Sequence, residues 1–445
     1  MPTFRNWART VECHPRHMVS ISSEQDLIHW IKESNRLNLP LRVVGAGHSP
    51  SDIACTNGIL ITMENYNQLL HIHPTTSEVT VQAGMRLHTL HQHLRKHQLA
   101  LSVLGSISDQ SVSGAVSTGT HGTGYRFGSL CSYVTRLRLV LADGRIRTCS
   151  GTSTDQDELD LFRAAVCSLG SLAVISEITL RVEPAYRLHA QRQVISFQDM
   201  LQQWSSLVTA AEHVRMWWWP HTDAVLVWSA NRTKAPADRQ PASWVQDRFV
   251  NYHLLELLYA GATFVPSLVP HINQWYAPVV GQTLPDEVDD SVAMFNFDCL
   301  FKQYVNEWAI DWKQGPVALR DLRTMIQDKQ LKVHFPVEIR FVQGEEGWLS
   351  PTYGLDCACY IGIIMYRPYG WDVEYQAYWK EYEAIMRLYK GRPHWAKAHT
   401  MTPRELANAY PQFEAFCRLR NQLDPKGRFL NDYLRRHLII NNAKL

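Results

Sequence analysis

The stretch Leu41–Ser51, with the sequence L-R-V-V-G-A-G-H-S-P-S, combines a strand, a glycine turn and a histidine. The aliphatic and β-branched residues before the glycines predict the strand. Gly45 and Gly47 lack Cβ atoms, so they permit positive φ values and let a ligand approach the backbone closely. Successive backbone N–H groups in such a turn can form a concave anion site. His48 follows directly, and Pro50 disfavours a helix at the residue before it.

This turn differs from the dinucleotide-binding fingerprint of a Rossmann fold. Gly45 and Gly47 supply G-x-G, but Pro50 stands where the third glycine belongs and no helix opens there. A G-x-G pair alone is equally compatible with an ordinary tight turn. A second observation is therefore needed to connect the turn with a ligand.

A second glycine-rich stretch, Leu104–Gly124, reads L-G-S-I-S-D-Q-S-V-S-G-A-V-S-T-G-T-H-G-T-G. Small side chains in such number suit a backbone that wraps a long polar ligand, because each N–H can then reach a phosphate or ribose oxygen. A flexible Gly/Ser linker is the alternative. Val112, Ala115 and Val116 argue against a linker, since they give the segment apolar surface to bury.

Together the two stretches resemble the FAD-binding domain of the vanillyl-alcohol oxidase flavoprotein family. Within it the chain is similar to the sugar-1,4-lactone oxidases, whose relatives that oxidise alditols share the same plan. The resemblance implies an α+β fold with two lobes, a PCMH-type FAD-binding domain and an α+β cap domain with a large antiparallel sheet. It also implies that FAD is the cofactor and that His48 is bonded covalently to its 8α-methyl group.

The same resemblance implies a set of FAD-contacting positions drawn from both glycine-rich stretches and from one later strand. They are Val44, Gly45, Ala46, Gly47, His48, Ser49, Gly105, Ser106, Ser111, Gly114, Ser117, Thr118, Gly119, Thr120, His121, Val174 and Ile175. Gly105 carries a further implication. In the family a glycine there leaves O2 a path to the flavin, whereas an alanine marks a dehydrogenase that reacts poorly with O2.

Length and composition fit this organisation. A chain of 445 residues predicts two or three lobes. We expect residues 1–184 to form the FAD-binding domain, 185–411 the substrate-binding cap, and 412–445 a segment that returns to the FAD-binding domain. The formal net charge of +2 gives no case for a nucleic-acid partner.

The cysteines and histidines predict no metal site. Nine cysteines without zinc spacing indicate a reducing compartment, and no basic-then-apolar leader predicts secretion. The histidines at 88, 91, 93 and 97 spread around the helix expected at 87–98, and no carboxylate or cysteine joins them, so we expect a solvated face and not a metal site. Asp143-Gly144 between two apolar runs predicts a hairpin with a type I′ turn.

The segment Pro336–Phe341, P-V-E-I-R-F, alternates like a strand, so Glu338 and Arg340 project from one face. From the residues alone this could be an ion pair on a solvated sheet. The resemblance implies instead the family's substrate strand. There the arginine lies near the flavin and the reacting carbon, and the glutamate orients the substrate hydroxyls.

His394-Trp395-Ala396-Lys397 matches a motif of lactone and alditol oxidases. A lysine ammonium can hydrogen-bond the hydroxyl that is being oxidised and help its proton to leave. The resemblance implies a catalytic set of Glu338, Arg340 and Lys397. It implies substrate contacts from these three residues together with Ser106 and His394.

The resemblance therefore implies an FAD-dependent oxidase of an aldono-1,4-lactone of gulono, galactono or arabinono type. Hydride would pass from C2 to flavin N5, and O2 would then be reduced to H2O2, giving ascorbate or an analogue. An alditol oxidase is the alternative within the same plan. A flavin-fold binding protein without turnover is the alternative from another class, and the intact Glu338, Arg340 and Lys397 argue against it.

Partners and location are predicted less directly. The apolar run Leu254–Val269 is interrupted by Glu256 and Pro266 and is too short for a membrane span, so a core helix is expected and a peripheral membrane contact stays open. The chain ends in Ala443-Lys444-Leu445, which is similar to the S-K-L peroxisomal signal. The surface of a mitochondrial or endoplasmic-reticulum membrane is the alternative location.

Overall fold

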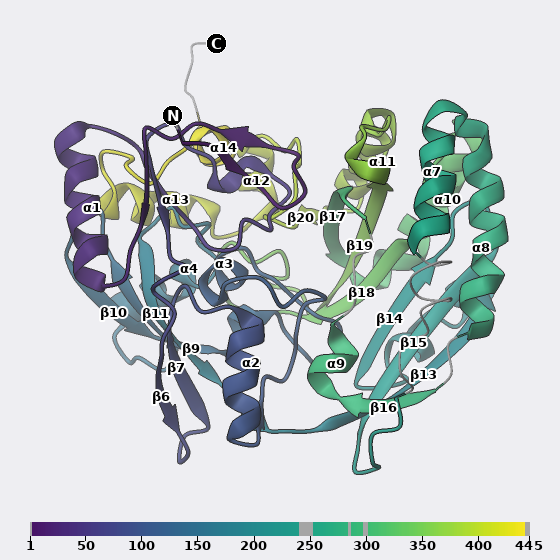
Figure 1. The fold of residues 1–445 in the computed structure, drawn as a ribbon, viewed down its shortest axis with the longest axis horizontal. Helices are drawn as coiled ribbons and strands as arrows, with labels where there is room; N and C mark the ends of the chain where they lie inside the picture. Colours follow the sequence, from purple (N-terminus) through teal and green to yellow (C-terminus); the bar gives the residue numbers. More distant parts are fainter. Residues whose placement is uncertain (1, 240–251, 284–285, 297–300, 441–445) are drawn as a thin grey trace.

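The computed structural model describes residues 2–239, 252–283, 286–296 and 301–440. Two lobes lie side by side, one built from both ends of the chain and the other from its middle (Figure 1). The expected α+β architecture with a large antiparallel sheet is confirmed.

The first lobe begins with a three-stranded parallel sheet in the order β3-β5-β4. Its strands are β3 (His17–Ser20), β4 (Leu41–Val44) and β5 (Ile59–Thr62). Helix α1 (Glu24–Leu37) crosses from β3 to β4. Ser23 caps it through a capping box with Asp26, and Asn38 ends it with φ 55°. The crossover thus delivers the Gly45 turn to the end of β4.

A five-stranded antiparallel sheet in the order β10-β9-β11-β7-β6 completes this lobe. Its strands are β6 (Leu69–His73), β7 (Glu78–Gln82), β9 (Val134–Val140), β10 (Ile146–Ser150) and β11 (Val174–Arg181). Its helices are α2 (Leu87–Lys96), α3 (Val112–Ser117) and α4 (Gln156–Ala165). Short elements join them: β1 (Phe4–Arg5), β2 (Glu12–Cys13), β8 (Leu99–Ala100), β12 (Glu183–Pro184) and the 3-10 turns η1 (Asp52–Ala54) and η2 (Leu130–Tyr133).

The second lobe is an eight-stranded antiparallel sheet in the order β16-β13-β15-β14-β18-β19-β17-β20. Its strands are β13 (Arg187–Ser196), β14 (His213–Trp218), β15 (Ala224–Thr233), β16 (Glu287–Asp290), β17 (Gln303–Asp311), β18 (Val337–Gln343), β19 (Cys357–Tyr366) and β20 (Arg392–Pro393). Strands β18 and β19 are central, so both of their edges are hydrogen-bonded to neighbouring strands.

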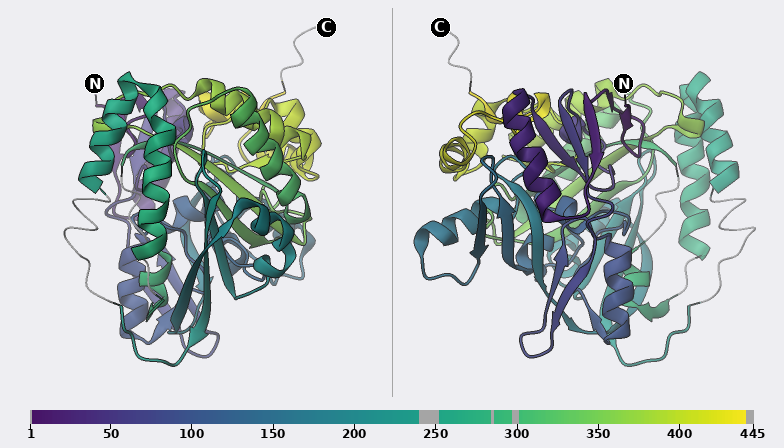
Figure 2. Two further views of the ribbon diagram at one scale, coloured as in Figure 1. Left: turned by 90° about the vertical axis from the view of Figure 1, so that its right-hand side faces the viewer. Right: turned by 60° about the vertical axis from the view of Figure 1, so that its left-hand side comes forward.

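Helices surround this sheet and include a hairpin of α7 and α8, which packs on one face of the sheet against Leu226 of β15 and Tyr366 of β19 (Figure 2, left). They are α5 (Phe197–Gln202), α6 (Trp204–Val208), α7 (Leu255–Phe264), α8 (Val269–Thr283), α9 (Ser291–Phe295), α10 (Gly315–Asp328) and α11 (Gln376–Leu388), with 3-10 turns η4 (Pro266–Leu268), η5 (Trp312–Gln314) and η6 (Pro368–Gly370). In the described part of the chain, no helix combines the length and the apolarity needed to cross a membrane.

The C-terminal helices α12 (Pro403–Ala409), α13 (Phe413–Leu423) and α14 (Asp432–Leu438) pack against the first lobe (Figure 1). The Leu41 N–H donates to the Arg428 carbonyl at 2.7 Å. Buried Arg42 donates to the carbonyls of Leu169, Gly170 and Phe429. These bonds attach the end of the chain to the strand that carries the Gly45 turn.

Several local expectations need correction. The Leu254–Val269 run is two helices separated at Pro266, not one core helix, and much of its turn is exposed. His91 on α2 is buried, not solvated. Of the pair Asp143-Gly144 only Gly144 has a positive φ, 85°, whereas a type I′ turn requires two.

Candidate functional site

The turn after β4 packs directly against the second glycine-rich stretch. A Cβ atom on Gly45 would lie 1.9 Å from Ser111 Oγ, so only glycine allows this approach. Gly47 has φ +66°, the left-handed region that glycine adopts without strain, and its carbonyl accepts the Trp7 N–H at 2.8 Å. The Trp7 ring stacks on the His48 imidazole with centroids 5.5 Å apart. The two stretches thus meet with little but backbone between them.

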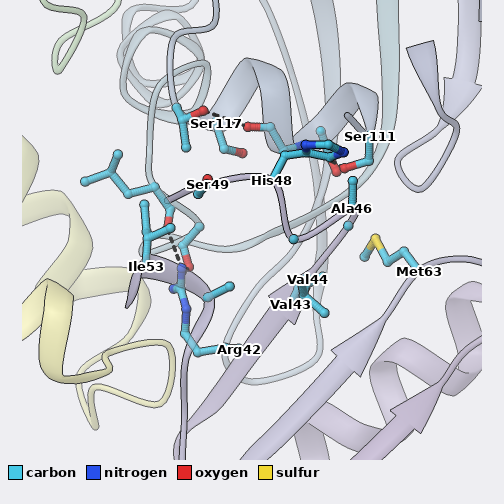
Figure 3. Close-up of a pocket in the computed structure, with 18 of the residues that line it drawn as sticks. Arg42, Val43, Val44, Ala46, His48, Ser49, Ile53, Met63, Ser111 and Ser117 are labelled. Atoms are coloured by element: carbon cyan, nitrogen blue, oxygen red, sulfur yellow. Dashed lines mark hydrogen bonds between the residues drawn. The ribbon is translucent and has the colours of Figure 1, made fainter. Parts of the chain in front are cut away.

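A cavity lies beneath this turn, with the His48 and Ser111 side chains at its rim (Figure 3). It is lined by the turn, by α3, by the loop at Leu169–Gly170, by the start of β11 and by Phe429. The lining includes many of the positions expected to contact FAD: Val44, Gly45, Ala46, Gly47, His48, Ser49, Ser111, Gly114, Ser117, Thr118, Val174 and Ile175. A hollow lined by bare backbone and small hydroxyl side chains fits a dinucleotide such as FAD.

The remaining positions expected to contact FAD lie outside this lining. Ser106 lines a neighbouring groove of about 1110 Å³, and His48 lines both spaces. Gly119 and Thr120 follow the end of α3. Gly105 packs against Thr120, since a Cβ atom on it would lie 3.0 Å from Thr120 Cγ2.

The surroundings of His48 favour the neutral form of its imidazole. Its Nδ1 is buried and has no hydrogen-bond partner among the described residues. Its Nε2 lies 3.9 Å from an Asp109 carboxylate oxygen. Burial lowers the pKa of His48, and the charges of Arg86 and Lys397 lower it further against the opposing effect of Asp109. A neutral ring nitrogen with a free lone pair can act as a nucleophile.

The second group of residues lies on the eight-stranded sheet, in two neighbouring rows across its strands. One row pairs Arg215 of β14 with Arg340 of β18 and Arg340 with Tyr360 of β19. In the next row Glu338 pairs with Gly362 of β19. The alternation expected for β18 is confirmed, but the strand is central and its charged face is buried rather than solvated.

Arg340 is the centre of this group. Its Nη2 is hydrogen-bonded to the Glu307 carboxylate, and its Nε lies 3.4 Å from Glu338 Oε2. Burial alone would lower the pKa of Arg340, but the carboxylates of Glu307 and Glu338 outweigh it, so its pKa lies above the usual range. The guanidinium is therefore charged at every working pH.

Polar atoms without partners gather around it. Glu338 Oε1, Arg340 Nε, His121 Nε2 and the Tyr360 hydroxyl have no hydrogen-bond partner within the described residues, although each is buried. Buried polar atoms in folded proteins are nearly always hydrogen-bonded, so such a cluster indicates a place where a polar ligand supplies the missing bonds.

His121 belongs to this group, because the chain from α3 reaches the cap sheet. The Gly124 N–H donates to the Phe341 carbonyl at 2.7 Å, which attaches the stretch to β18. The His121 ring stacks on Tyr360 with centroids 3.7 Å apart. Burial, the charge of Arg340 and the neighbouring His394 lower the pKa of His121 well below its usual range.

His121, Glu307 and His394 have their ligand atoms within 4.8 Å of one another, which by residue type resembles a cation site. However, the Glu307 carboxylate already accepts a hydrogen bond from Arg340 Nη2. Burial lowers the pKa of His394 to about 3, and its Nδ1 accepts the Ala396 N–H at 3.1 Å. The group is better described as a buried polar cluster around Arg340.

Lys397 connects the two groups. Its N–H donates to the His394 carbonyl at 2.9 Å, which closes the turn of the H-W-A-K segment. The Ser51 N–H donates to the Ala396 carbonyl at 3.3 Å, so this turn lies beside the one that carries His48. The half-buried Lys397 influences the pKa of both His48 and Glu307. The structure thus brings Glu338, Arg340, His394 and Lys397 to the border of the two lobes.

Sequence reasoning missed Glu307, Arg215 and Tyr360. Glu307 lies in the strand segment Q-Y-V-N-E-W-A-I-D, where a single glutamate among apolar residues was an available signal. Arg215 lies between aliphatic residues in the same way. Nothing in the sequence indicated that Tyr360 would face His121.

Fold and cavity define a two-lobed FAD-binding oxidoreductase. Residues 15–150 match the model of the FAD binding domain, and residues 178–437 match that of D-arabinono-1,4-lactone oxidase. The chain belongs to the D-arabinono-1,4-lactone oxidase family.

Named relatives and solved structures agree with this assignment. The chain is 39% identical to an L-gulonolactone oxidase of Scyliorhinus torazame over 432 residues, 97% of each chain. It is 34% identical to an L-gulono-1,4-lactone dehydrogenase of Mycobacterium tuberculosis over 443 residues, 98% of this chain and 99% of the relative. The structure of a cholesterol oxidase from Brevibacterium sterolicum shares the fold, with a TM-score of 0.82 and 16% identity over 98% and 96% of the two chains.

Proposed function

We propose that this protein is an FAD-dependent oxidase of aldono-1,4-lactones. The observation that carries the proposal is that two buried atoms on one face of β18, Glu338 Oε1 and Arg340 Nε, have charged groups at 3.7 and 3.4 Å but make no hydrogen bond within the described residues. A carboxylate acceptor beside a guanidinium donor suits a polyhydroxylated ring with a carbonyl oxygen. The names of the relatives support a lactone as that ring.

Each of the three proposed catalytic side chains has a role that its position allows. Glu338 accepts a hydrogen bond from a lactone hydroxyl and so fixes the ring's orientation. Arg340 donates from Nε to an oxygen that gains negative charge. Lys397 hydrogen-bonds the hydroxyl at the reacting carbon and stabilises its oxygen as the proton leaves. His394 and Ser106 are proposed as further substrate contacts.

The cofactor does the redox chemistry, and the chain binds it. When bound, FAD takes the hydride from the substrate carbon and passes the electrons on to O2. The backbone of Gly45–Ser49 and the N-terminal part of α3 hold the dinucleotide in the cavity between them. Burial of the site beneath both lobes excludes water from the reacting atoms.

A substrate panel with peroxide detection tests the function. We expect one or more aldono-1,4-lactones to reduce the bound flavin anaerobically and to yield H2O2 in air. Glu338→Gln should lower turnover by about tenfold or more, because it removes the charged acceptor. Xylitol or sorbitol reacting far faster than any lactone would contradict the proposal in favour of an alditol oxidase. Failure of both classes to reduce the flavin would favour a binding protein without turnover.

We propose further that FAD is attached covalently through His48. The support is the buried Nδ1, which has no hydrogen-bond partner among the described residues, on a ring whose pKa burial lowers and which lies next to the cavity. Protein denatured in acid should stay yellow, and one peptide should carry the mass increment of FAD. His48→Ala should retain little flavin. All of the FAD released into the acid supernatant would refute the linkage.

The exposed surface around η4 supports a peripheral membrane contact. Phe264 is 75% exposed, and the centroid of its ring lies 5.7 Å from that of the exposed Trp371 ring. Leu257, Val265, Leu268, Trp275 and Tyr369 extend this apolar tip. The segment 252–283 has no Lys, Arg or Asp, and its single Glu256 is buried. Aromatic side chains on a protruding uncharged turn suit the interface of a lipid bilayer.

Sedimentation with phosphatidylcholine vesicles tests the contact. The double variant Phe264→Glu/Trp371→Glu should stay in the supernatant while the unchanged protein sediments. Leu388→Glu is the matched control, because Leu388 is 70% exposed at the end of α11 and lies outside the tip. Equal sedimentation of all three proteins would exclude the tip as the contact.

The proposed peroxisomal signal, Ala443-Lys444-Leu445, lies outside the described residues. An oxidase that makes H2O2 is well placed beside catalase, which supports this location. An N-terminal fluorescent fusion should give puncta that disperse when the last three residues are deleted. A membrane pattern, or puncta that persist after deletion, would contradict the proposal.

A further inference from the structure

Glu307 is a buried carboxylate on β17 that the proposed chemistry leaves without a role. Its side chain is 3% exposed. Register across the sheet places it in one row with two residues of the site. Glu338 pairs with Gly362, and Gly362 pairs with Glu307. The two carboxylates thus flank a glycine on neighbouring strands.

Gly362 leaves the strip between these carboxylates without a side chain. The three atoms nearest to a Cβ atom placed on it all belong to Glu307, at 3.7 Å for Oε1 and 3.8 Å for Cγ and Cδ. These are ordinary van der Waals distances, so a methyl group there would pack against Glu307 without a clash. The backbone conformation there does not demand glycine either, because Gly362 is absent from the positive-φ glycines of the described chain.

Arg340 lies in the neighbouring row of the sheet and contacts both carboxylates that flank Gly362. Its Nη2 bonds to Glu307, and its Nε lies 3.4 Å from Glu338 Oε2. Its Nη1 donates weakly to the His121 carbonyl at 3.5 Å. Contacts from three segments therefore fix the plane of the guanidinium, and Nε lies beside the Glu338 carboxylate without making a hydrogen bond within the described residues.

We propose that Glu307 is a positioning residue for Arg340, and that Gly362 keeps the strip between Glu307 and Glu338 open for the lactone. Glu307 holds the Nη2 side of the guanidinium so that the Nε edge faces the substrate. The inference rests on the proposed lactone oxidation and assigns a residue and a subsite wall to it.

The ionisation of Glu307 supports its proposed role in positioning Arg340. Burial would raise the pKa of Glu307, but Arg340 and, more weakly, His121, Lys397 and His394 outweigh it, and its pKa lies well below the usual range. Glu307 is therefore ionised throughout the working range. A buried ion pair stabilises a protein little in net terms, yet it fixes geometry, as a positioning role requires.

Anaerobic flavin reduction tests the proposal, because it separates binding of the lactone from hydride transfer. Glu307→Gln keeps the shape and removes the charge. It should lower the limiting reduction rate by about tenfold to a hundredfold, the usual effect of losing one charge-assisted bond in a site. Flavin content should change little, whereas the melting temperature should fall, because buried Arg340 loses one of its two carboxylate partners.

A double-mutant cycle distinguishes positioning from a general structural role. If Glu307 acts through Arg340, Glu307→Gln should cause little further loss of rate in an Arg340→Lys background. Additive losses would overturn the proposal, as would a wild-type reduction rate in Glu307→Gln alone. Glu287→Gln is the matched control, because Glu287 pairs with Arg192 at the far edge of the same sheet. Its rate should be unchanged.

Glu307→Asp decides the question if Glu307→Gln yields no folded holoenzyme. It keeps the charge but shortens the reach to Arg340 by one methylene. A lowered reduction rate with normal flavin content supports positioning, and a wild-type rate refutes it. Inability of the unchanged enzyme to oxidise any lactone would instead refute the proposed function, which keeps the two failures apart.

Gly362→Ala tests the open strip independently. Its methyl group fits the folded protein, so melting temperature and flavin content should hold. The lactone's dissociation constant should rise by about tenfold, because the methyl fills the space that the ring uses. An unchanged dissociation constant would refute the proposed role of Gly362 in lactone binding.

Discussion

Single residues decide whether the two glycine-rich stretches can meet. Gly45→Ala would put a Cβ atom 1.9 Å from Ser111 Oγ and 2.6 Å from Ser111 Cβ. The turn and α3 would have to separate, so we expect a loss of about 1–3 kcal/mol in the free energy of unfolding and little bound FAD. Urea unfolding and the ratio of flavin to protein measure both effects.

Ser111→Gly in the same chain provides the control. It removes both atoms that the new methyl would meet, and glycine is nearly as good as serine at a helix N-cap. The double variant should therefore regain FAD. If the double variant still binds no FAD, the alanine at position 45 acts through the backbone of the turn and not through Ser111.

Gly105 gives a second prediction at this scale. A methyl on it would lie 3.0 Å from Thr120 Cγ2 and 3.6 Å from the His121 carbonyl oxygen. Since interiors have few spare voids, we expect Gly105→Ala to slow reoxidation of the reduced flavin by O2 and to spare its reduction by lactone. Stopped-flow reoxidation measures this directly.

Thr120→Ser separates access of O2 from simple strain around Gly105. In the double variant Gly105→Ala/Thr120→Ser, the serine lacks the methyl group that the new alanine would crowd, whereas the alanine at position 105 remains in place. Slow reoxidation in the double variant supports a closed path for O2. Full recovery would mean that displacement of Thr120 caused the effect.

The residue scale also shows what the sequence could and could not predict. The Gly45 turn was predictable, because glycine spacing and an adjacent histidine are local signals. The role of Glu307 was not, although the glutamate in its strand was a visible signal, because the role depends on how β17 and β18 pair with β19 and on where Arg340 then lies. His91 was misjudged, since the helical pattern did not reveal which element covers it.

Among the elements, α14 depends on Asn431. Its Oδ1 accepts the Leu434 N–H at 3.0 Å and caps the helix. Its Nδ2 donates to the carbonyls of Asp52, Ile53 and Cys55 at 3.2, 3.0 and 2.8 Å. One amide thus joins the end of the chain to η1, which closely follows the His48 turn.

Asn431→Ala should lower the free energy of unfolding by about 2 kcal/mol, because it removes the cap and leaves buried carbonyls without a donor. The retained FAD should fall as η1 loosens. Asn431→Asp keeps the oxygen that caps α14 but loses the Nδ2 donor to the three carbonyls. Its free energy of unfolding should therefore be close to that of Asn431→Ala. A chemical melt of the three proteins measures this, and full stability of Asn431→Asp would show that only the cap matters.

Element boundaries were predictable where the signals are local. Ser23 and Asp26 define the start of α1, and alternation defines β18. The break of the Leu254–Val269 run was underestimated, although Pro266 marks it. The hairpin turn differs because Asp143-Gly144 supports a type I turn followed by a glycine bulge as well as a type I′ turn, and the sequence does not distinguish them.

In the whole molecule, the arrangement of the lobes came from the family resemblance and not from periodicity. The order β14-β18-β19-β17 places strands separated by more than a hundred residues beside each other. No local pattern encodes such pairings. What the residues did indicate is that Glu338 and Arg340 share a face, and the surrounding sheet then buries that face.

Buried neutral histidines make the stability of the whole molecule depend on pH. His334 shows the cause, because its Nδ1 accepts the Tyr366 N–H at 2.9 Å and its ring lies 4.2 Å from that of Tyr259. Burial and the nearby His221 lower the pKa of His334 to about 3. Protonation would remove the acceptor and place a charge in an apolar cluster.

The sign of the effect follows from linkage. The unfolded chain binds a proton near pH 6.5 and the folded chain does not, so this stabilisation is complete above pH 6.5 and is lost as pH falls toward 3. At pH 5 the loss for His334 is on the order of 2 kcal/mol. His334→Asn keeps an acceptor without titrating, so urea unfolding at pH 7 and pH 5 should show a smaller difference in this variant than in the unchanged protein. Equal differences in the two proteins would show that His334 does not contribute to acid sensitivity.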